Sequence, residues 1–469
     1  MAAPLGMLMV GLIFAQLLAR IMDSPAVQVV TWSLAACVVL AARRSMGLRE
    51  GYLLVLSAVL TGSLVVWGSD PAREIAAALD QATFLMTFIL LMGLLHEAAS
   101  TSPSVESCGR YLTQQPAGRQ YPALYAGTGV MAVLFNLGVV SFLVPLVRRG
   151  IAAATPGDAQ NPVRERRQIS AVLRGFAWSV VWSPTAIAPL AVVELIPGVN
   201  RPLWIGLGFG IYLAMLLLGA VEDKLRFRAF LFDKDRPAAP FPLIATALFF
   251  AACGVMFTMT LIAMWLTGDT VVFGLMLACP VMLTGWLGVQ YLQPFGKDMV
   301  ATVQRALTAT GQRLHHIVTV NLPKSAAIAV TLGCSGFVGR AAASLMPADS
   351  LATGLGIYAM PDFVLLSLIP VLLSLLSLLA LSPIMMAVFF GSLFGSLDIM
   401  PANPTLIALS ISCGWALSMT FSPFATVVLL IDRVAGISPR RLTWGWNLTH
   451  AGLSAVALVP IFAMLAWWV

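Results

Sequence analysis

Two stretches of this chain carry the same pattern: residues 175–186 read GFAWSVVWSPTA, and residues 414–425 read GWALSMTFSPFA. Six of the twelve aligned positions are identical. Each copy places a Ser-Pro pair, Ser183-Pro184 or Ser422-Pro423, inside a long apolar segment. Proline lacks a backbone N–H and clashes with the carbonyl four residues earlier, so a helix is expected to break at each pair. The sequence therefore predicts two broken helices that belong to an internal repeat.

The composition places this repeat in a membrane. Of the 469 residues, 59% are hydrophobic and only 10% are charged, whereas soluble domains carry about a quarter charged residues. A membrane-spanning helix needs about 20 apolar residues, and apolar windows of that length recur along the chain. The sequence predicts an all-α polytopic membrane protein. Its net charge of +7 is explained by basic loops, so no nucleic-acid partner is expected, and the lipid bilayer is the expected surrounding.

We expect about 11 spanning helices and two re-entrant hairpins. The predicted spans are 4–20, 26–42, 51–68, 81–99, 169–197, 203–221, 241–266, 270–291, 323–346, 403–431 and 446–468, and the hairpins are 121–147 and 361–397. The predicted organisation is an extra N-terminal helix (1–25), a first repeat (26–221), a cytoplasmic linker (222–240) and a second repeat (241–469). Two ordinary short helices in place of either hairpin are an open alternative.

The basic residues predict the orientation of the chain. With the loop that contains Arg43, Arg44 and Arg49 in the cytoplasm, most of the 27 Lys and Arg fall in cytoplasmic loops, as the positive-inside rule requires. The expected location is a bacterial inner membrane, with the N-terminus cytoplasmic and the C-terminus periplasmic. The two Ser-Pro segments then run in opposite directions, and inverted repeats with broken helices are typical of secondary transporters.

A broken helix offers groups that bind ions. The freed carbonyl oxygens can coordinate a cation, and the N-terminus of the following half-helix presents free amides and a positive dipole end to an anion. A simple proline kink is the alternative for each Ser-Pro pair. Two pairs at matching positions favour the functional interpretation.

A second pattern precedes each broken helix. Phe135-Asn136-Leu137-Gly138 leads to Pro145 in the first half, and Ala380-Leu381-Ser382-Pro383 stands at the corresponding place in the second. This pattern resembles the ion-transporter superfamily, most of all its divalent-anion/sodium symporter branch, in which a hairpin tip with an Asn is followed by an apolar run and a proline. The resemblance implies an elevator mechanism, sodium sites near the tips and a homodimer.

The candidate binding residues are polar or helix-breaking residues at these tips and breaks. The predicted substrate or ion-binding set is Asn136, Gly138, Ser141, Ser183, Pro184, Thr185, Ser382, Pro383, Ser422, Pro423 and Thr426. An amide such as that of Asn136 can both donate to a carboxylate and accept from a cation's shell. For each hydroxyl, a hydrogen bond to its own helix is the alternative.

Three carboxylates near span ends are candidate proton carriers: Glu97, Glu194 and Asp398. Ionisable residues in a membrane are functional candidates because burying their charge is costly. No cofactor and no metal beyond Na⁺ are expected, since the six cysteines lack CxxC spacing.

The function that these features favour is a symporter for a small anion, such as an organic di- or monocarboxylate, driven by Na⁺ or H⁺. A cation/proton antiporter or metalloid exporter on the same fold is one alternative, and a membrane enzyme or lipid-carrier flippase is another. Enzymatic activity is not expected, because the chain has no Walker loop, nucleophile elbow or HExxH motif.

Overall fold

The computed structural model describes residues 2–99, 101–230, 239–292, 299–379 and 381–469, and every regular element within these ranges is helical. Eleven helical segments are long and apolar enough to cross a membrane. They are Ala3–Met22, Pro25–Ser45, Leu48–Trp67, Pro71–Ala98, Arg201–Arg226, Leu243–Thr267, Val271–Leu292, Ala326–Ser344, Asp362–Leu379, Pro404–Ala435 and Arg441–Trp468. The prediction of an all-helical membrane protein with about eleven spans is confirmed.

The set of eleven differs from the predicted set in one member. The predicted span 169–197 consists of two shorter helices, α8 (Asn161–Ser179) and α9 (Ile187–Leu195), and neither belongs to the eleven. α8 begins at Asn161, before the apolar segment, because an Asn-Pro pair is a favourable helix start. Its first turns are polar, so the predicted apolar span does not include them. Instead, Asp362–Leu379 in the second predicted hairpin is long enough to span by itself.

The chain forms two compact units, and both combine segments from the two halves of the sequence. Unit 1 comprises Met1–Val105 and Thr246–Ala341, and unit 2 comprises Glu106–Ala245 and Ala342–Val469. Each predicted repeat therefore contributes its first helices to unit 1 and its later helices to unit 2.

Unit 1 is built from long helices. They are α1 (Ala2–Met22), α2 (Pro25–Ala42), α3 (Leu48–Trp67), α4 (Pro71–Ala99), most of α11 (Leu243–Thr267), α12 (Val271–Leu292), α13 (Met299–His316), α14 (Leu322–Lys324) and most of α15 (Ala326–Ser344). α1 packs against α2, and α4 packs against α12. At one end of this unit, the Arg20 Nε atom donates a 2.8 Å hydrogen bond to Asp269.

Unit 2 contains both predicted hairpins and both predicted breaks. After α5 (Pro103–Thr113), its helices are α6 (Ala117–Phe135), α7 (Gly138–Ala154), α8, α9, α10 (Arg201–Arg226), α16 (Ala348–Gly354), α17 (Asp362–Leu376), α18 (Pro383–Gly395), α19 (Pro404–Phe421), α20 (Thr426–Ala435) and α21 (Leu448–Trp468).

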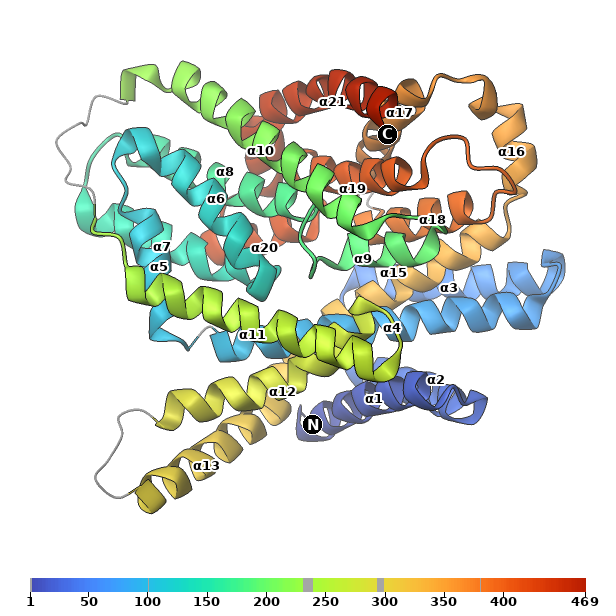
Figure 1. Ribbon diagram of the computed structural model, residues 1–469, viewed down its shortest axis with the longest axis horizontal. Helices are drawn as coiled ribbons and strands as arrows, with labels where there is room; N and C mark the ends of the chain where they lie inside the picture. Colours follow the sequence, from blue (N-terminus) through green and yellow to red (C-terminus); the bar gives the residue numbers. More distant parts are fainter. Residues whose placement is uncertain (1, 100, 231–238, 293–298, 380) are drawn as a thin grey trace. The chain divides into compact units, whose positions relative to one another are not determined.

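The two halves of unit 2 pack in the same way (Figure 1). α6 packs against α8 in the first half, and α17 packs against α19 in the second. The halves also interlock, because α7 contacts α20, α9 contacts α18 and α8 contacts α19. The second arm of each hairpin thus lies against the short helix that follows the break in the other half.

Candidate substrate site at the broken helices

The first hairpin turns at Asn136. α6 ends at Phe135 and α7 begins at Gly138. Asn136 has a φ of +46°, a region that residues other than glycine seldom adopt and that asparagine tolerates better than most. Its side-chain amide donates to the carbonyl oxygen of Thr185 at 3.5 Å. The predicted tip therefore coincides with the observed turn and lies beside the first break.

The first broken helix is interrupted between Ser179, where α8 ends, and Ile187, where α9 begins. Within this interval the Thr185 hydroxyl donates a 2.7 Å hydrogen bond to the carbonyl oxygen of Val133, in the last turn of α6. The hydroxyls of Ser183 and Thr185 are 3.1 Å apart, and both side chains are buried. The break is thereby attached to the first arm of the hairpin.

The second broken helix has an equivalent attachment. α19 ends at Phe421, and α20 begins at Thr426. The Ser422 hydroxyl donates a 2.9 Å hydrogen bond to the carbonyl oxygen of Ser377, directly after α17. Ser422 is buried, and so is Ser382, the residue before α18. Ala380, in the predicted second tip, lies outside the described residues.

The glycine that starts each repeated motif explains why broken helix and hairpin can pack so closely. A Cβ atom on Gly175 would lie 2.4 Å from the carbonyl oxygen of Tyr125 in α6. A Cβ atom on Gly414 would lie 2.9 Å from a Leu373 methyl and 3.1 Å from the Cα of Pro370, both in α17. Such contacts require glycine at both positions. The glycine shared by the two repeats therefore allows the same close packing of broken helix on hairpin arm in each half.

Four helices begin at the tips and breaks of unit 2: α7, α9, α18 and α20. A helix N-terminus carries a partial positive charge and unpaired amides, so it attracts an anion. The side chains at these positions are neutral. Asn136 and Thr185 come from the first half, whereas Ser382 and Ser422 come from the second. This arrangement can bind a small anion without a charged side chain.

The other predicted binding residues lie on the same segments. Gly138 is the first residue of α7 and Ser141 lies in its first turn, Pro383 begins α18, and Thr426 begins α20. Pro423 is buried, whereas Pro184 is partly buried. Their binding roles stay predictions.

The three predicted proton carriers lie elsewhere. Glu97, in unit 1, forms a 3.0 Å ion pair with Arg313 and accepts a 2.6 Å hydrogen bond from Asn321. Glu194 pairs with Arg201 at 3.2 Å, and both side chains are partly exposed. Asp398 is exposed in the loop after α18. A proton-carrying role for them stays a prediction.

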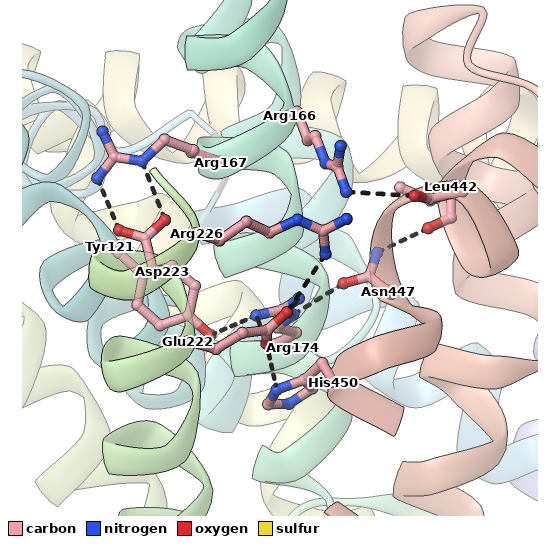
Figure 2. A network of polar contacts seen from close by, with 11 residues as sticks. Tyr121, Arg166, Arg167, Arg174, Glu222, Asp223, Arg226, Leu442, Asn447 and His450 are labelled. Atoms are coloured by element: carbon pink, nitrogen blue, oxygen red, sulfur yellow. Dashed lines mark hydrogen bonds and ion pairs between the residues drawn. The ribbon is translucent and has the colours of Figure 1, made fainter. Parts of the chain in front are cut away.

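Unit 2 also contains a buried charged network that connects α6, α8, α10 and α21 (Figure 2). Arg167 of α8 forms a bidentate pair with Asp223 of α10, with distances of 2.9 and 2.7 Å. Two turns further along α8, on the same face, Arg174 lies 2.9 Å from Glu222. All four side chains are less than 10% exposed, so each charge depends on its partner.

Arg174 is the centre of this network (Figure 2). Its Nε atom donates to Asn447 at 2.8 Å, and one of its terminal nitrogens donates to the Tyr121 hydroxyl at 3.2 Å. His450 of α21 places Nδ1 3.2 Å from Glu222. Asn447 also donates a 2.7 Å hydrogen bond to the carbonyl oxygen of Leu442. The start of α21 is thereby bound to α8.

None of these residues is among the predicted site residues. Arg174 and His450 lie inside the predicted spans 169–197 and 446–468, where the rule that intramembrane ionisable residues are functional candidates would have found them. Arg167 and Arg174 are also seven residues apart, which places them on one helix face. Glu222 and Asp223 begin the predicted linker, but α10 continues to Arg226 and both are buried.

No protein-family model matches the chain, and no curated protein matches its sequence. Solved structures with a similar fold do exist. The Alcanivorax borkumensis YdaH transporter is 15% identical, with a TM-score of 0.57, over 89% of this chain and 99% of that one. Neisseria gonorrhoeae MtrF, described within a class of antimetabolite efflux pumps, is 12% identical, with a TM-score of 0.52, over 92% of this chain and 97% of that one.

At these identities the likeness concerns the fold, and it extends over nearly the whole length of all three chains. Both neighbours are transporters. Together with the eleven apolar helical segments, the comparison shows that this chain is a multi-pass membrane protein with a transporter-like helical fold.

Proposed function

We propose that this chain is a secondary active transporter for a small anion, such as an organic di- or monocarboxylate, coupled to Na⁺ or H⁺. The observation that carries the proposal is the pair of hydroxyl-to-carbonyl attachments, Thr185 to Val133 and Ser422 to Ser377. They join each break to the end of a hairpin arm without a charged side chain. The N-termini of α7, α9, α18 and α20 then supply the positive potential for an anion.

The proposal includes an elevator mechanism. Unit 2 contains both hairpins and both broken helices, so it would be the moving transport domain, and unit 1 would be the scaffold. We place the protein in a bacterial inner membrane with a cytoplasmic N-terminus, on the strength of its basic loops. A homodimer completes the proposal, and it rests on the family resemblance.

The direction of transport is a separate part of the proposal. The similarity in fold to MtrF, described within a class of antimetabolite efflux pumps, supports export of an anionic compound as a second candidate. A cation/proton antiporter on the same fold would bind a cation in place of the anion, and the experiment below separates it from both.

The experiment is a thermal-shift screen of the purified full-length protein. Mono- and dicarboxylates, phosphate and sulfate are added one at a time, in sodium or in choline buffer. A ligand at 100 times its Kd stabilises the folded state by about 2.7 kcal/mol. We expect one class of anion to raise the Tm, and sodium to strengthen the effect if it is the coupling ion.

Asn136→Gly is the informative variant in this screen. Glycine accepts the positive φ of Asn136 but removes the amide, so we expect the Tm shift with the anion to disappear. Asp23→Gly is the matched control, because Asp23 also has a φ of +46° and follows α1 in unit 1. A response to cations or pH alone would favour the antiporter, and an anion shift that persists in Asn136→Gly would contradict the proposed site.

A further inference from the structure

His450 lies in the buried network with one ring nitrogen engaged and the other open. The side chain is 0% exposed. Nδ1 lies 3.2 Å from the Glu222 carboxylate, and since an ionised carboxylate only accepts, Nδ1 carries the hydrogen. Nε2 has no hydrogen-bond partner among the described residues, and the same holds for the hydroxyl of Ser454, one turn further along α21. An open Nε2 on a neutral ring has a lone pair that can take a proton.

Glu222 carries one negative charge but faces two arginines as well as His450. Its oxygens lie 2.9 Å from Arg174 and 3.6 Å from Arg226, besides the contact with His450. Asp223 is already engaged by Arg167. A proton on His450 therefore adds a second buried positive charge that competes with Arg174 for the same carboxylate, in surroundings where charges interact strongly.

The space beside this network fits water and not a substrate. A cavity of about 10 Å³ lies among Tyr121, Arg174, Glu222 and their neighbours. That volume is close to the smallest that holds a single water molecule. The cavity is thus too small to hold a substrate anion between the arginines, and it borders Glu222 but not His450.

We propose that His450 and Glu222 form the proton-binding site of this transporter, and that its occupancy controls how Arg174 holds α8. The inference rests on the proposed transport function and names H⁺ as the coupling ion. In the proton-binding step, a hydronium ion gives its proton to the lone pair of His450 Nε2 and becomes water, and Nδ1 keeps its hydrogen toward Glu222. The reverse step on the other side of the membrane returns the proton to water.

The connection to the substrate site runs along α8. Arg174 joins α8 to Asn447 and to Tyr121 of α6, and α8 ends at Ser179, just before the break at Ser183-Pro184. When His450⁺ competes for Glu222, Arg174 loses part of its counter-charge, so the bonds that hold this end of α8 weaken. Proton binding and the position of the break are thereby coupled.

The elements around α21 present few other charges to His450. α10 contributes Glu222 with its neighbours Asp223 and Arg226, and α8 contributes Arg174. The segment before α21 (Arg441–Asn447) carries Arg441, which stacks on Trp446. α19 has no carboxylate or base, and α17 has only Asp362, its first residue. Glu222 and Arg174 are thus the groups that set the charge of His450.

Proton binding can be measured directly by NMR on the full-length protein in nanodiscs. The chain has four histidines, so labelling histidine Cε1 with ¹³C gives only a few signals. The signal that is missing from the spectrum of His450→Gln belongs to His450. Over a titration from about pH 4 to pH 9, we expect the Cε1 signal of His450 to move as the ring takes up a proton. Glu222→Gln should lower the midpoint by about one unit or more, whereas Glu106→Gln, at an exposed carboxylate of α5, should not change it.

The same titration reports on Arg174. With ¹⁵N-arginine and Arg174→Lys for assignment, the Arg174 Nε–H signal should shift with the midpoint of His450, because both groups share Glu222. The inference is overturned if His450 keeps one protonation state over the whole pH range. It is also overturned if the chemical shift of Arg174 Nε–H stays constant while His450 titrates. The titration curves are recorded on the wild-type protein, and the two variants serve only to assign its signals.

A transport experiment tests the coupling. Proteoliposomes containing pyranine, in sodium-free buffer, receive inward gradients of succinate, citrate, glutamate or phosphate. Proton movement driven by one of them should occur in the wild type and in His316→Gln, an exposed histidine of α13, and should fall to the level of empty liposomes in His450→Gln. Anion transport with no proton movement overturns the inference. If none of these anions moves, the proposed anion class fails, and the NMR titration still decides the proton site.

Discussion

The hydroxyl of Ser422 donates a hydrogen bond to the carbonyl oxygen of Ser377, 45 residues earlier in the chain, at 2.9 Å. In the first half Thr185 makes the same kind of bond to Val133, 52 residues earlier, at 2.7 Å. Each bond joins a broken helix to the C-terminal end of a hairpin arm. Since four helix N-termini lie at these tips and breaks, the two bonds determine where those N-termini are held.

Removing the Ser422 hydroxyl should therefore affect ligand binding more than stability. A net hydrogen bond contributes about 1 kcal/mol, so we expect Ser422→Ala to lower the Tm only moderately. The apparent affinity for the anion, measured from the Tm shift at increasing anion concentration, should in contrast fall at least tenfold. The reason is that the break is no longer attached to the hairpin arm. Thr185→Val should behave in the same way.

Ser438→Ala is the control for this pair, since Ser438 is exposed after α20. It should leave both the Tm and the anion response unchanged. Full anion affinity in both Ser422→Ala and Thr185→Val would show that these bonds do not position the binding groups.

The glycines of the repeat give a second prediction. Gly175→Ala places a Cβ atom 2.4 Å from a backbone oxygen of α6, so α6 and α8 must move apart, at a cost of about 1–3 kcal/mol. Gly206→Ala on α10 meets no atom within 4 Å and should not lower the stability. Equal Tm values for the two variants would contradict the close packing of α6 on α8.

The buried pair between Arg167 and Asp223 gives a third prediction. Arg167→Met leaves Asp223 buried without its counter-charge, and losing one partner of such a pair costs about 3–5 kcal/mol. The double variant Arg167→Met with Asp223→Leu removes both charges, so it should regain most of the loss. Arg110→Met, in an exposed pair with Glu106, should have little effect. A double variant no more stable than Arg167→Met would exclude this explanation.

The ion pair of Arg20 and Asp269 predicts a pH effect in unit 1. The hydrogen bond from Arg20 lowers the pKa of Asp269 below its ordinary value. A carboxyl group with a lowered pKa stabilises the fold above its unfolded pKa of about 3.9, and the contribution is lost as the pH falls through the folded value. Because the pair is partly exposed, Asp269→Asn should cost less than about 1 kcal/mol at pH 7.

The difference in Tm between the wild type and Asp269→Asn should then shrink as the pH is lowered below about 4. A difference that stays constant through this range would show that the charge of Asp269 contributes nothing.

Much of the fold could be predicted from local sequence features. The Ser-Pro pairs located both breaks, and Asn136 located the first turn, because proline and positive φ are properties of single residues. Ten of the eleven spans followed from apolar length alone, whereas Asp362–Leu379 was predicted as part of a hairpin. The start of α8 could not be found in this way, since its polar first turns resemble a cytoplasmic loop until their partners are known.

Those partners are distant in the sequence. Arg174 contacts Glu222, 48 residues away, and Asn447, 273 residues away. No periodicity connects these positions, so their network appears only when α8, α10 and α21 are packed together. Likewise, Glu97 has the residue type expected of a proton carrier, but its pairing with Arg313 depends on the fold of unit 1.

The central claim, that the broken helices of unit 2 form an anion-transport site, is tested most directly by transport in proteoliposomes. The measurement is gradient-driven uptake of a radiolabelled anion that raises the Tm of the wild type. The account predicts uptake above that of empty liposomes, abolished in Asn136→Gly and Ser422→Ala and retained in Asp23→Gly. Uptake by Asn136→Gly and Ser422→Ala equal to that of the wild type, or no uptake by the wild type itself, would contradict it.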